Sequence, residues 1–151
     1  MEAFTFGEPV PVLSQREVFD YLESMHNGRW YEPPLSLNGL SRVYRAGVHH
    51  ASAIQVKRNI LRSCFIPHPK LSLAGFTGLA LDYLIFGNGY LQAVQNRIGG
   101  VLRYDHLHAK YTRRGLDLDA YWWIAQPGQE QVLPAGRVGH VMESEIGRAH
   151  V

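Results

Sequence analysis

The spacing of apolar residues changes from a helical to a strand-like period near the middle of the chain. From Asn38 to about Phe65, apolar positions recur every three or four residues, which predicts helix. Ser72 is expected to cap a second helix, rich in Leu, Phe and Ala, that runs to about Phe86. Beyond Gly89 the apolar positions alternate, as they do in strands. This order, N-terminal helices followed by an antiparallel β-hairpin and sheet, predicts an α+β fold.

Two further serines mark candidate helix starts. Ser14 stands three residues before Glu17, and this capping-box spacing predicts a helix that ends at residues 27–28, an Asn-Gly pair. Ser52 is a candidate cap for the second part of the helical stretch described above. Residues 1–13 contain two prolines and are predicted to form an extended N-terminal arm.

The alternating half of the chain contains several predicted strands. Residues 90–95 and 101–107 flank a turn with two glycines, which is typical of a β-hairpin. Further strands are predicted at residues 120–125, 131–133 and 137–142, which are separated by turns that contain proline and glycine. No window of 18 apolar residues is present, so we expect no membrane partner.

The helical and strand-like halves join at DYLIFGNGYLQ, residues 82–92, where an apolar run breaks at Gly87, Asn88 and Gly89. In a dinucleotide-binding loop the glycines follow a strand and open a helix. Here they follow a helix, and Gln92 occupies the position of the third glycine of that motif. The segment is therefore predicted to be a structural corner, in which a helix C-cap turns into a strand. We expect a positive φ at one of the two glycines and no bound cofactor.

Composition is typical of a folded globular domain. The 151 residues suffice for one domain, 46% are hydrophobic and 19% are charged, and 15 basic against 13 acidic residues give a net charge of +2. So small an excess, without a run of like charges, does not by itself indicate nucleic-acid binding. Cys64 is the single cysteine, so an intrachain disulfide is excluded, which suits a reducing compartment. We interpret Cys64 as a core thiol.

His106 and His108 stand two positions apart on a predicted strand, so their rings share one face and suit zinc ligation. No cysteine or acidic residue lies at a persuasive ligand spacing from them, and we interpret both as surface or packing residues. Asp117 and Asp119 are interpreted as solvent-facing residues at the entry to a strand. The common nucleophile, phosphate-loop and metalloprotease motifs are missing. The sequence thus predicts no catalytic, cofactor-binding or metal-binding residue and no enzyme.

Two small basic clusters allow more than one interpretation. Each is favoured as a solvated face, but each also suits phosphate groups or an acidic neighbouring subunit. The clusters are Lys57, Arg58 and Arg62, and Lys110, Arg113 and Arg114. The alternative function is therefore a stand-alone nucleic-acid-binding module, which predicts DNA affinity that falls steeply with salt. A third hypothesis, a metal-dependent enzyme centred on His106 and His108, predicts stoichiometric zinc.

Several stretches taken together resemble one protein family. They are similar, in this order, to the N-terminal part of the portal proteins of contractile-tailed temperate phages and prophages. The stretches are FTFGEPVPVL, NGRWYEPPLSLNGLSRVYRAGVHHASAIQVKRNIL, FIPHP, LDYLIFGNGYLQAVQNRIGGVLRY and AKYTRRGLDLDAYWWI. The resemblance covers nearly all of residues 4–142, and the ordered series is far more specific than any one motif in it.

The resemblance implies a structural subunit of the portal, a head-to-tail connector ring of usually twelve copies at one capsid vertex. It implies that the genome is packaged and ejected through the ring, that the terminase large subunit docks on it and that tail or neck proteins bind later. The implied partners are therefore further copies of the chain, the terminase large subunit, capsid or scaffold proteins, tail or neck proteins and double-stranded DNA. The implied location is the virion and, during assembly, the host cytoplasm. The family has no catalytic residues or cofactor of its own.

Portal proteins are considerably longer than this chain, so we expect it to be a truncated N-terminal part. By resemblance, residues 14–144 correspond mainly to the outer wing of the ring, and the arm 1–13 reaches towards neighbouring proteins. The last seven residues, 145–151 (EIGRAHV), resemble the translation of a sequencing-library adaptor. We therefore expect that tail to be non-native.

A closed ring uses two different contact patches on each subunit. We expect the exposed aromatic residues of the connector NGRWYEPP and the basic helix 38–65 to contribute to these patches. The predicted subunit-interface residues are Trp30, Tyr31, Lys57, Arg58 and Arg62. An isolated fragment is then expected to expose unpaired apolar surface.

Overall fold

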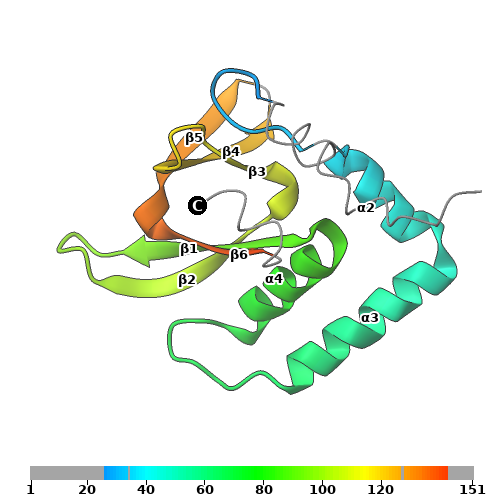
Figure 1. The fold of residues 1–151 in the computed structure, drawn as a ribbon. Helices are drawn as coiled ribbons and strands as arrows, with labels where there is room; N and C mark the ends of the chain where they lie inside the picture. Colours follow the sequence, from blue (N-terminus) through cyan, green and yellow to red (C-terminus); the bar gives the residue numbers. More distant parts are fainter. Residues whose placement is uncertain (1–25, 34, 127, 143–151) are drawn as a thin grey trace, which may run out of the picture.

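The computed structural model describes residues 26–33, 35–126 and 128–142. Within them, helices come first and antiparallel strands follow (Figure 1), which confirms the predicted α+β class. The helices are α2 (Leu37–Ala46), α3 (Val48–Ser63) and α4 (Leu73–Phe86). The strands are β1 (Asn88–Gln95), β2 (Val101–Leu107), β3 (Thr112–Arg114), β4 (Ala120–Gln126), β5 (Gln129–Pro134) and β6 (Val138–Met142), with single 3-10 turns at η2 (Ala109–Tyr111) and η3 (Ala135–Arg137).

Three predictions fall on residues outside the described part of the chain. They are the extended arm 1–13, the body of the helix that begins at Ser14, and the tail 145–151. Among the helices that the structure describes, none combines the length and the apolar character needed to cross a membrane.

The first helical stretch divides at Gly47. This residue has an extended backbone, with φ of −100° and ψ of 108°, and α2 and α3 form two separate rods on either side of it (Figure 1). Ser52 lies inside α3, so the prediction that it caps a helix is wrong. Gly47 is a weaker helix former than Ser52, so the helix breaks at Gly47 instead. The start of α2 is capped by Ser36, whose Oγ accepts a hydrogen bond from the Gly39 N–H at 3.2 Å.

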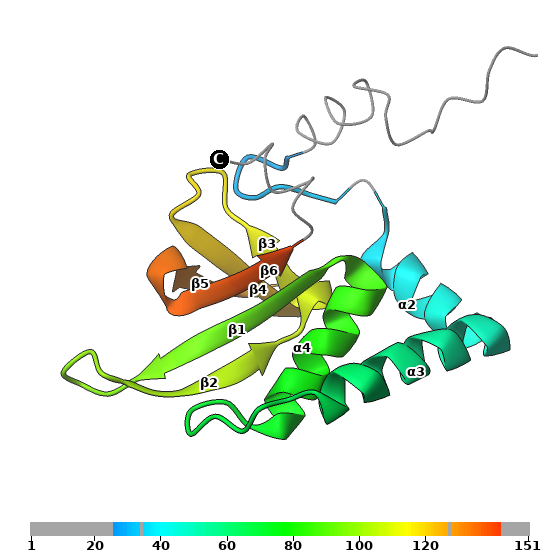
Figure 2. The same ribbon diagram turned by 60° about the horizontal axis from the view of Figure 1, so that its bottom comes forward.

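The predicted cap at Ser72 is confirmed, because its Oγ accepts a hydrogen bond from the Gly75 N–H at 3.0 Å. The helix that follows, α4, is apolar over most of its circumference, as expected for a helix with neighbours on several sides. It contacts α3 on one side and strands β1 and β2 on another (Figure 2). Helix α4 is therefore the central helix of the described structure.

The strands form two three-stranded antiparallel sheets, ordered β2-β1-β6 and β3-β4-β5. The predicted hairpin is confirmed as β1 and β2. Strand β6 returns to the free edge of β1, so Tyr90 lies opposite Leu107 on one side and His140 on the other. The strands predicted at 120–125, 131–133 and 137–142 correspond to β4, β5 and β6. The sequence did not indicate β3, because three residues are too few to show an alternating pattern.

The apolar core lies between the two sheets. It comprises Tyr90, Leu107, Ala109, Tyr121 and Leu133, which come from both sheets and from η2. In β1 the alternation of side chains separates two contacts: Tyr90 faces the second sheet, with its ring 5.8 Å from that of Tyr121, whereas Gly89 faces Leu79 of α4. The elements therefore stack as α4, the β2-β1-β6 sheet and the β3-β4-β5 sheet.

Candidate functional site

The helix-to-strand corner is built as the sequence predicts. Gly87 ends α4 in the left-handed region with a φ of 70°, and its N–H donates to the Tyr83 carbonyl oxygen at 2.9 Å. This confirms the expected positive φ. The Asn88 Nδ2 donates to the Phe86 carbonyl oxygen at 3.2 Å, which satisfies one of the last carbonyl groups of the helix.

A line of polar side chains connects this corner to the second sheet. The His140 Nε2 donates to the Asn88 Oδ1 at 2.9 Å, and the Tyr121 hydroxyl lies 3.3 Å from the His140 Nδ1. The Arg114 Nη1 in turn donates to the Tyr121 hydroxyl oxygen at 2.9 Å. One chain of contacts therefore joins β1, β6, β4 and β3, and it fixes the corner relative to both sheets.

Two buried tyrosines stand beside this line. The Tyr90 ring stacks on His140 with centroids 4.3 Å apart. Burial raises the pKa of the Tyr90 hydroxyl far above its ordinary value, and the neighbouring Tyr121 adds to the rise. Burial also raises the pKa of Tyr121, although the Arg114 guanidinium opposes part of the change. Both phenols are therefore neutral at ordinary pH, which suits a packing role.

The structure brings His106 and His108 to an acidic residue that the sequence did not indicate. Asp82 is buried in α4, and its Oδ2 accepts hydrogen bonds from the His106 Nε2 at 2.9 Å and the Ala109 N–H at 2.7 Å. The His108 Nδ1 lies 3.8 Å from the same oxygen. The prediction that the two histidines lack an acidic partner is therefore wrong, because the packing of α4 on β2 supplies Asp82 from 24 residues away. The one feature of the sequence that could have indicated this contact was Asp82, a carboxylate in an otherwise apolar helix.

Two other interpretations of single residues can be compared with the structure. Asp117 and Asp119 are exposed in the turn before β4, as predicted. Cys64 is exposed, so its interpretation as a core thiol is wrong. Cys64 is the C-cap residue of α3. The chain leaves the helix at this position, so Cys64 does not continue the side of the helix that packs on its neighbours.

The prediction that the aromatic residues of the connector are exposed is wrong for Trp30. This residue is only 6% exposed, its indole Nε1 donates to the Glu32 Oε1 at 2.6 Å, and its ring lies 5.3 Å from that of Trp122. The connector is held along β3, since the Tyr31 N–H donates to the Arg114 carbonyl oxygen at 3.0 Å. Trp30 therefore anchors the connector to its own chain, whereas Tyr31 is half-buried.

The basic residues of α3 are more accessible. Lys57 and Arg62 are exposed and Arg58 is half-buried. The interface role predicted for these three residues remains a prediction.

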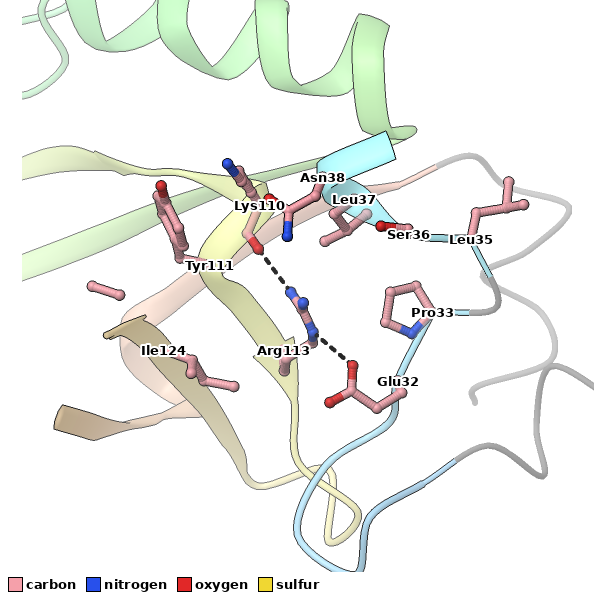
Figure 3. A pocket seen from close by; sticks show the side chains of 11 residues that line it. Glu32, Pro33, Leu35, Ser36, Leu37, Asn38, Lys110, Tyr111, Arg113 and Ile124 are labelled. Carbon is pink, nitrogen blue, oxygen red and sulfur yellow. Dashed lines mark hydrogen bonds and ion pairs between the residues drawn. The ribbon is translucent and has the colours of Figure 1, made fainter. Parts of the chain in front are cut away.

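The second basic cluster is engaged within the chain (Figure 3). The Arg113 Nε donates to the Glu32 Oε2 at 3.3 Å, and its Nη1 donates to the Lys110 carbonyl oxygen at 3.0 Å. The Arg114 guanidinium is bound to Tyr121, and the Lys110 Nζ lies 5.3 Å from the Tyr111 ring centroid. Cations with internal partners gain less from phosphate, so this second cluster gives the nucleic-acid hypothesis no support.

The Arg113 to Glu32 pair crosses a hollow of about 470 Å³ between the connector and the second sheet (Figure 3). Its wall continues through Pro33, Leu35 and Ile124, which are apolar. Arg113 and Glu32 are paired with each other across this hollow, and the Glu32 side chain is 40% exposed, so the hollow is a partly exposed contact between two chain segments.

The fold occurs in solved structures of gene transfer agent particles. It matches a chain in the virion of a native particle with a TM-score of 0.64 and 15% identity, over 85% of this chain and 41% of that one. It also matches a chain in the neck of a native particle, computed with C12 symmetry, with a TM-score of 0.65 and 13% identity, over 85% of this chain and 41% of that one. The chain therefore shares its fold with chains of such particles.

The sequence comparison is more specific. The chain is 51% identical over 148 residues to a protein described as a probable portal protein of Escherichia phage P2. This match covers 98% of the chain and confirms the predicted resemblance to phage portal proteins. The chain spans 43% of the length of that relative. No family model matches the chain.

Proposed function

We propose that this chain is a segment of a portal subunit, the structural protein of a ring at one capsid vertex through which the genome is packaged and ejected. The observation that carries the proposal is the 51% identity with the probable portal protein of phage P2 across 98% of the chain. The fold shared with chains of the virion and neck of gene transfer agent particles supports the same structural role.

Helix α3 is the proposed site of contact with a neighbouring subunit. A closed ring joins two different patches, one from each neighbour. On α3, Val56 and Ile60 are 57% and 56% exposed, beside the exposed cations Lys57 and Arg62. Apolar side chains rimmed by charge are typical of surfaces that become buried by a partner. In this proposal Trp30 acts indirectly, by holding the connector in place.

The remaining partners follow from the same proposal. The ring would contain usually twelve copies of the subunit, and it would contact capsid or scaffold proteins at the vertex. The terminase large subunit would dock during packaging in the host cytoplasm, and tail or neck proteins would bind in the virion. Double-stranded DNA would pass through the channel without being chemically changed.

A segment exchange tests the proposal. The matching segment of the phage P2 portal protein is replaced by this chain without residues 145–151, and the chimera is supplied to phage that lacks its own portal protein. We expect closed rings in electron micrographs and DNA-filled particles, because half of the residues and the fold are shared. A chimera with Tyr121→Asp serves as the control for misfolding, since it places a charge in the core.

The decisive result is whether a chimera that is soluble and folded forms rings and particles. If the chimera has the helical and strand content of the parent by circular dichroism but forms neither rings nor particles, the proposed function is wrong.

A further inference from the structure

Asp82, His106 and His108 bring three metal-ligating side chains into one cluster. Their ligand atoms, a carboxylate oxygen and one ring nitrogen from each histidine, all lie within 4.8 Å of one another. Asp82 comes from α4, His106 from β2 and His108 from the residue that precedes η2. The cluster therefore spans the contact between the central helix and the first sheet, and it is separate from the proposed contact surface on α3.

Two of the three distances between ligand atoms are close to those of a tetrahedral metal centre. Ligand bonds of about 2.0–2.2 Å to zinc place neighbouring ligand atoms roughly 3.3–3.5 Å apart. The Asp82 Oδ2 lies 2.9 Å from the His106 Nε2 and 3.8 Å from the His108 Nδ1. Both separations are within about 0.6 Å of the tetrahedral value. The two imidazole rings are 4.6 Å apart by centroid and inclined at 75°, so they lie side by side next to the carboxylate.

Two of the three side chains are already held in place. Asp82 is buried, and the Ala109 N–H donates to its Oδ2 at 2.7 Å, which orients the carboxylate. The His106 side chain is only 13% exposed and packs directly on Gly78 of α4. A Cβ atom at position 78 would stand 2.6 Å from the His106 Nδ1, so the helix has room for this ring only because residue 78 is glycine. A ligand set held in this way needs little reorganisation to bind an ion.

The third side chain, that of His108, lies on the side of the cluster that is open to solvent. The His108 side chain is 61% exposed, and its Nδ1 lies 3.8 Å from the Asp82 Oδ2. Asp82 and His108 also line a hollow of about 530 Å³ between α2, α4 and η2, so solvent reaches the cluster from this side. Arg42, Arg45 and Lys110 line the same hollow and would favour an anionic group, such as hydroxide, at the open coordination position.

We propose that Asp82, His106 and His108 bind a divalent first-row metal ion, with zinc preferred, and that the ion fastens α4 to the end of β2. The ion takes the place of the proton between the His106 Nε2 and the Asp82 carboxylate: a neutral His106 then carries its one ring proton on Nδ1, and a protonated His106 releases its Nε2 proton to solvent. Two imidazoles and one carboxylate are typical zinc ligands, whereas magnesium and calcium prefer sets made of oxygen. The open fourth position belongs to solvent.

Titration of the metal-free 151-residue chain with zinc chloride tests this proposal. We expect one zinc ion per chain by calorimetry and a rise in the melting temperature with zinc concentration, because the ion binds the folded state. Magnesium chloride at the same concentration should give neither effect. Long-range ¹H–¹⁵N spectra should show the zinc-dependent change at the Nε2 of His106 and the Nδ1 of His108.

His108→Ala is the decisive variant, because the exposed His108 side chain can be removed without opening the core. We expect its zinc affinity to fall by at least tenfold, since losing even a partner of a ligand costs roughly 10- to 100-fold. His49→Ala, which removes another exposed histidine from α3, should bind zinc like the parent chain. If zinc does not bind at micromolar concentration, or if His108→Ala binds it as tightly as the parent, the proposal is wrong. Unchanged nitrogen shifts at His106 and His108 would also overturn it.

Discussion

Gly89 of β1 lies so close to Leu79 of α4 that a Cβ atom at position 89 would stand 2.6 Å from the Leu79 Cδ1 atom. It would also stand 3.2 Å from the Leu79 carbonyl oxygen. At this point the first sheet can approach the central helix so closely because β1 has no side chain there. Gly89 therefore allows the close packing of β1 on α4, whereas Gly87 supplies the left-handed backbone that ends α4.

Gly89→Ala should destabilise the fold, because either the Leu79 side chain or the β1 backbone has to move. We expect the free energy of unfolding to fall by about 1–3 kcal/mol, as for other overpacked sites. Urea denaturation followed by circular dichroism measures this change. Gly136→Ala is the matched control, since a Cβ atom there meets nothing within 4 Å, and it should leave stability nearly unchanged.

Substitution of Gly87 should act through the backbone alone. A Cβ atom at this position has no neighbour within 4 Å, but its φ of 70° is unfavourable for residues with a side chain. Gly87→Ala should cost about 1–2 kcal/mol, and Gly87→Asn should cost less because asparagine tolerates the left-handed region. Equal costs for the two variants in urea denaturation would contradict this explanation.

Tyr90 should make the fold sensitive to alkaline pH. Burial raises the pKa of Tyr90 in the folded state, so above pH about 10 the unfolded chain loses this proton first. The contribution to stability is complete below that pH and is lost as the pH rises, by about 1 kcal/mol for each pH unit. Unfolding measured from pH 8 to 11 should therefore show a shallower decline in Tyr90→Phe than in the parent chain. Parallel profiles would show that Tyr90 ionises freely in the folded state.

Trp30 should matter for stability rather than for surface contacts. Trp30→Ala removes a buried ring that packs on Trp122, and it should cost about 3–5 kcal/mol. Trp30→Phe keeps much of the ring packing but loses the hydrogen bond from Nε1 to Glu32, which is worth roughly 1–3 kcal/mol. Thermal unfolding of both variants should rank them in that order. Two parent-like melting curves would show that the connector is not anchored by this side chain.

Charge reversal on α3 should weaken ring assembly without weakening the fold. In the chimeric portal protein, Lys57→Glu combined with Arg62→Glu should reduce the yield of closed rings, measured by mass photometry, by at least tenfold. The melting temperature should stay within a few degrees of the parent, because both side chains are exposed. Arg137→Glu, an exposed reversal in η3, is the control for reversing a surface charge elsewhere in the chain. Normal ring yield in the double variant would remove α3 from the proposed interface.

Local sequence signals predicted the elements that depend on local interactions. The Ser72 cap, a left-handed glycine at the corner and the hairpin of β1 and β2 were all predicted correctly, because capping, glycine turns and alternation act between residues close in sequence. The helix break was expected near the right place but at Ser52 instead of Gly47, since either residue allows a local break. The ordered motifs also indicated the portal family, which the match to the phage P2 relative confirms.

Contacts between distant segments were decided by the tertiary structure. Asp82 meets His106 only because Gly78 lets β2 approach α4, and Trp30 is buried only because the connector lies along β3. The sequence by itself determined the order of helices and strands, the glycine corner and the family. Only the packing of α4 and the two sheets decided which polar residues share a site and which aromatic residues are covered, because burial depends on neighbours that local spacing does not specify.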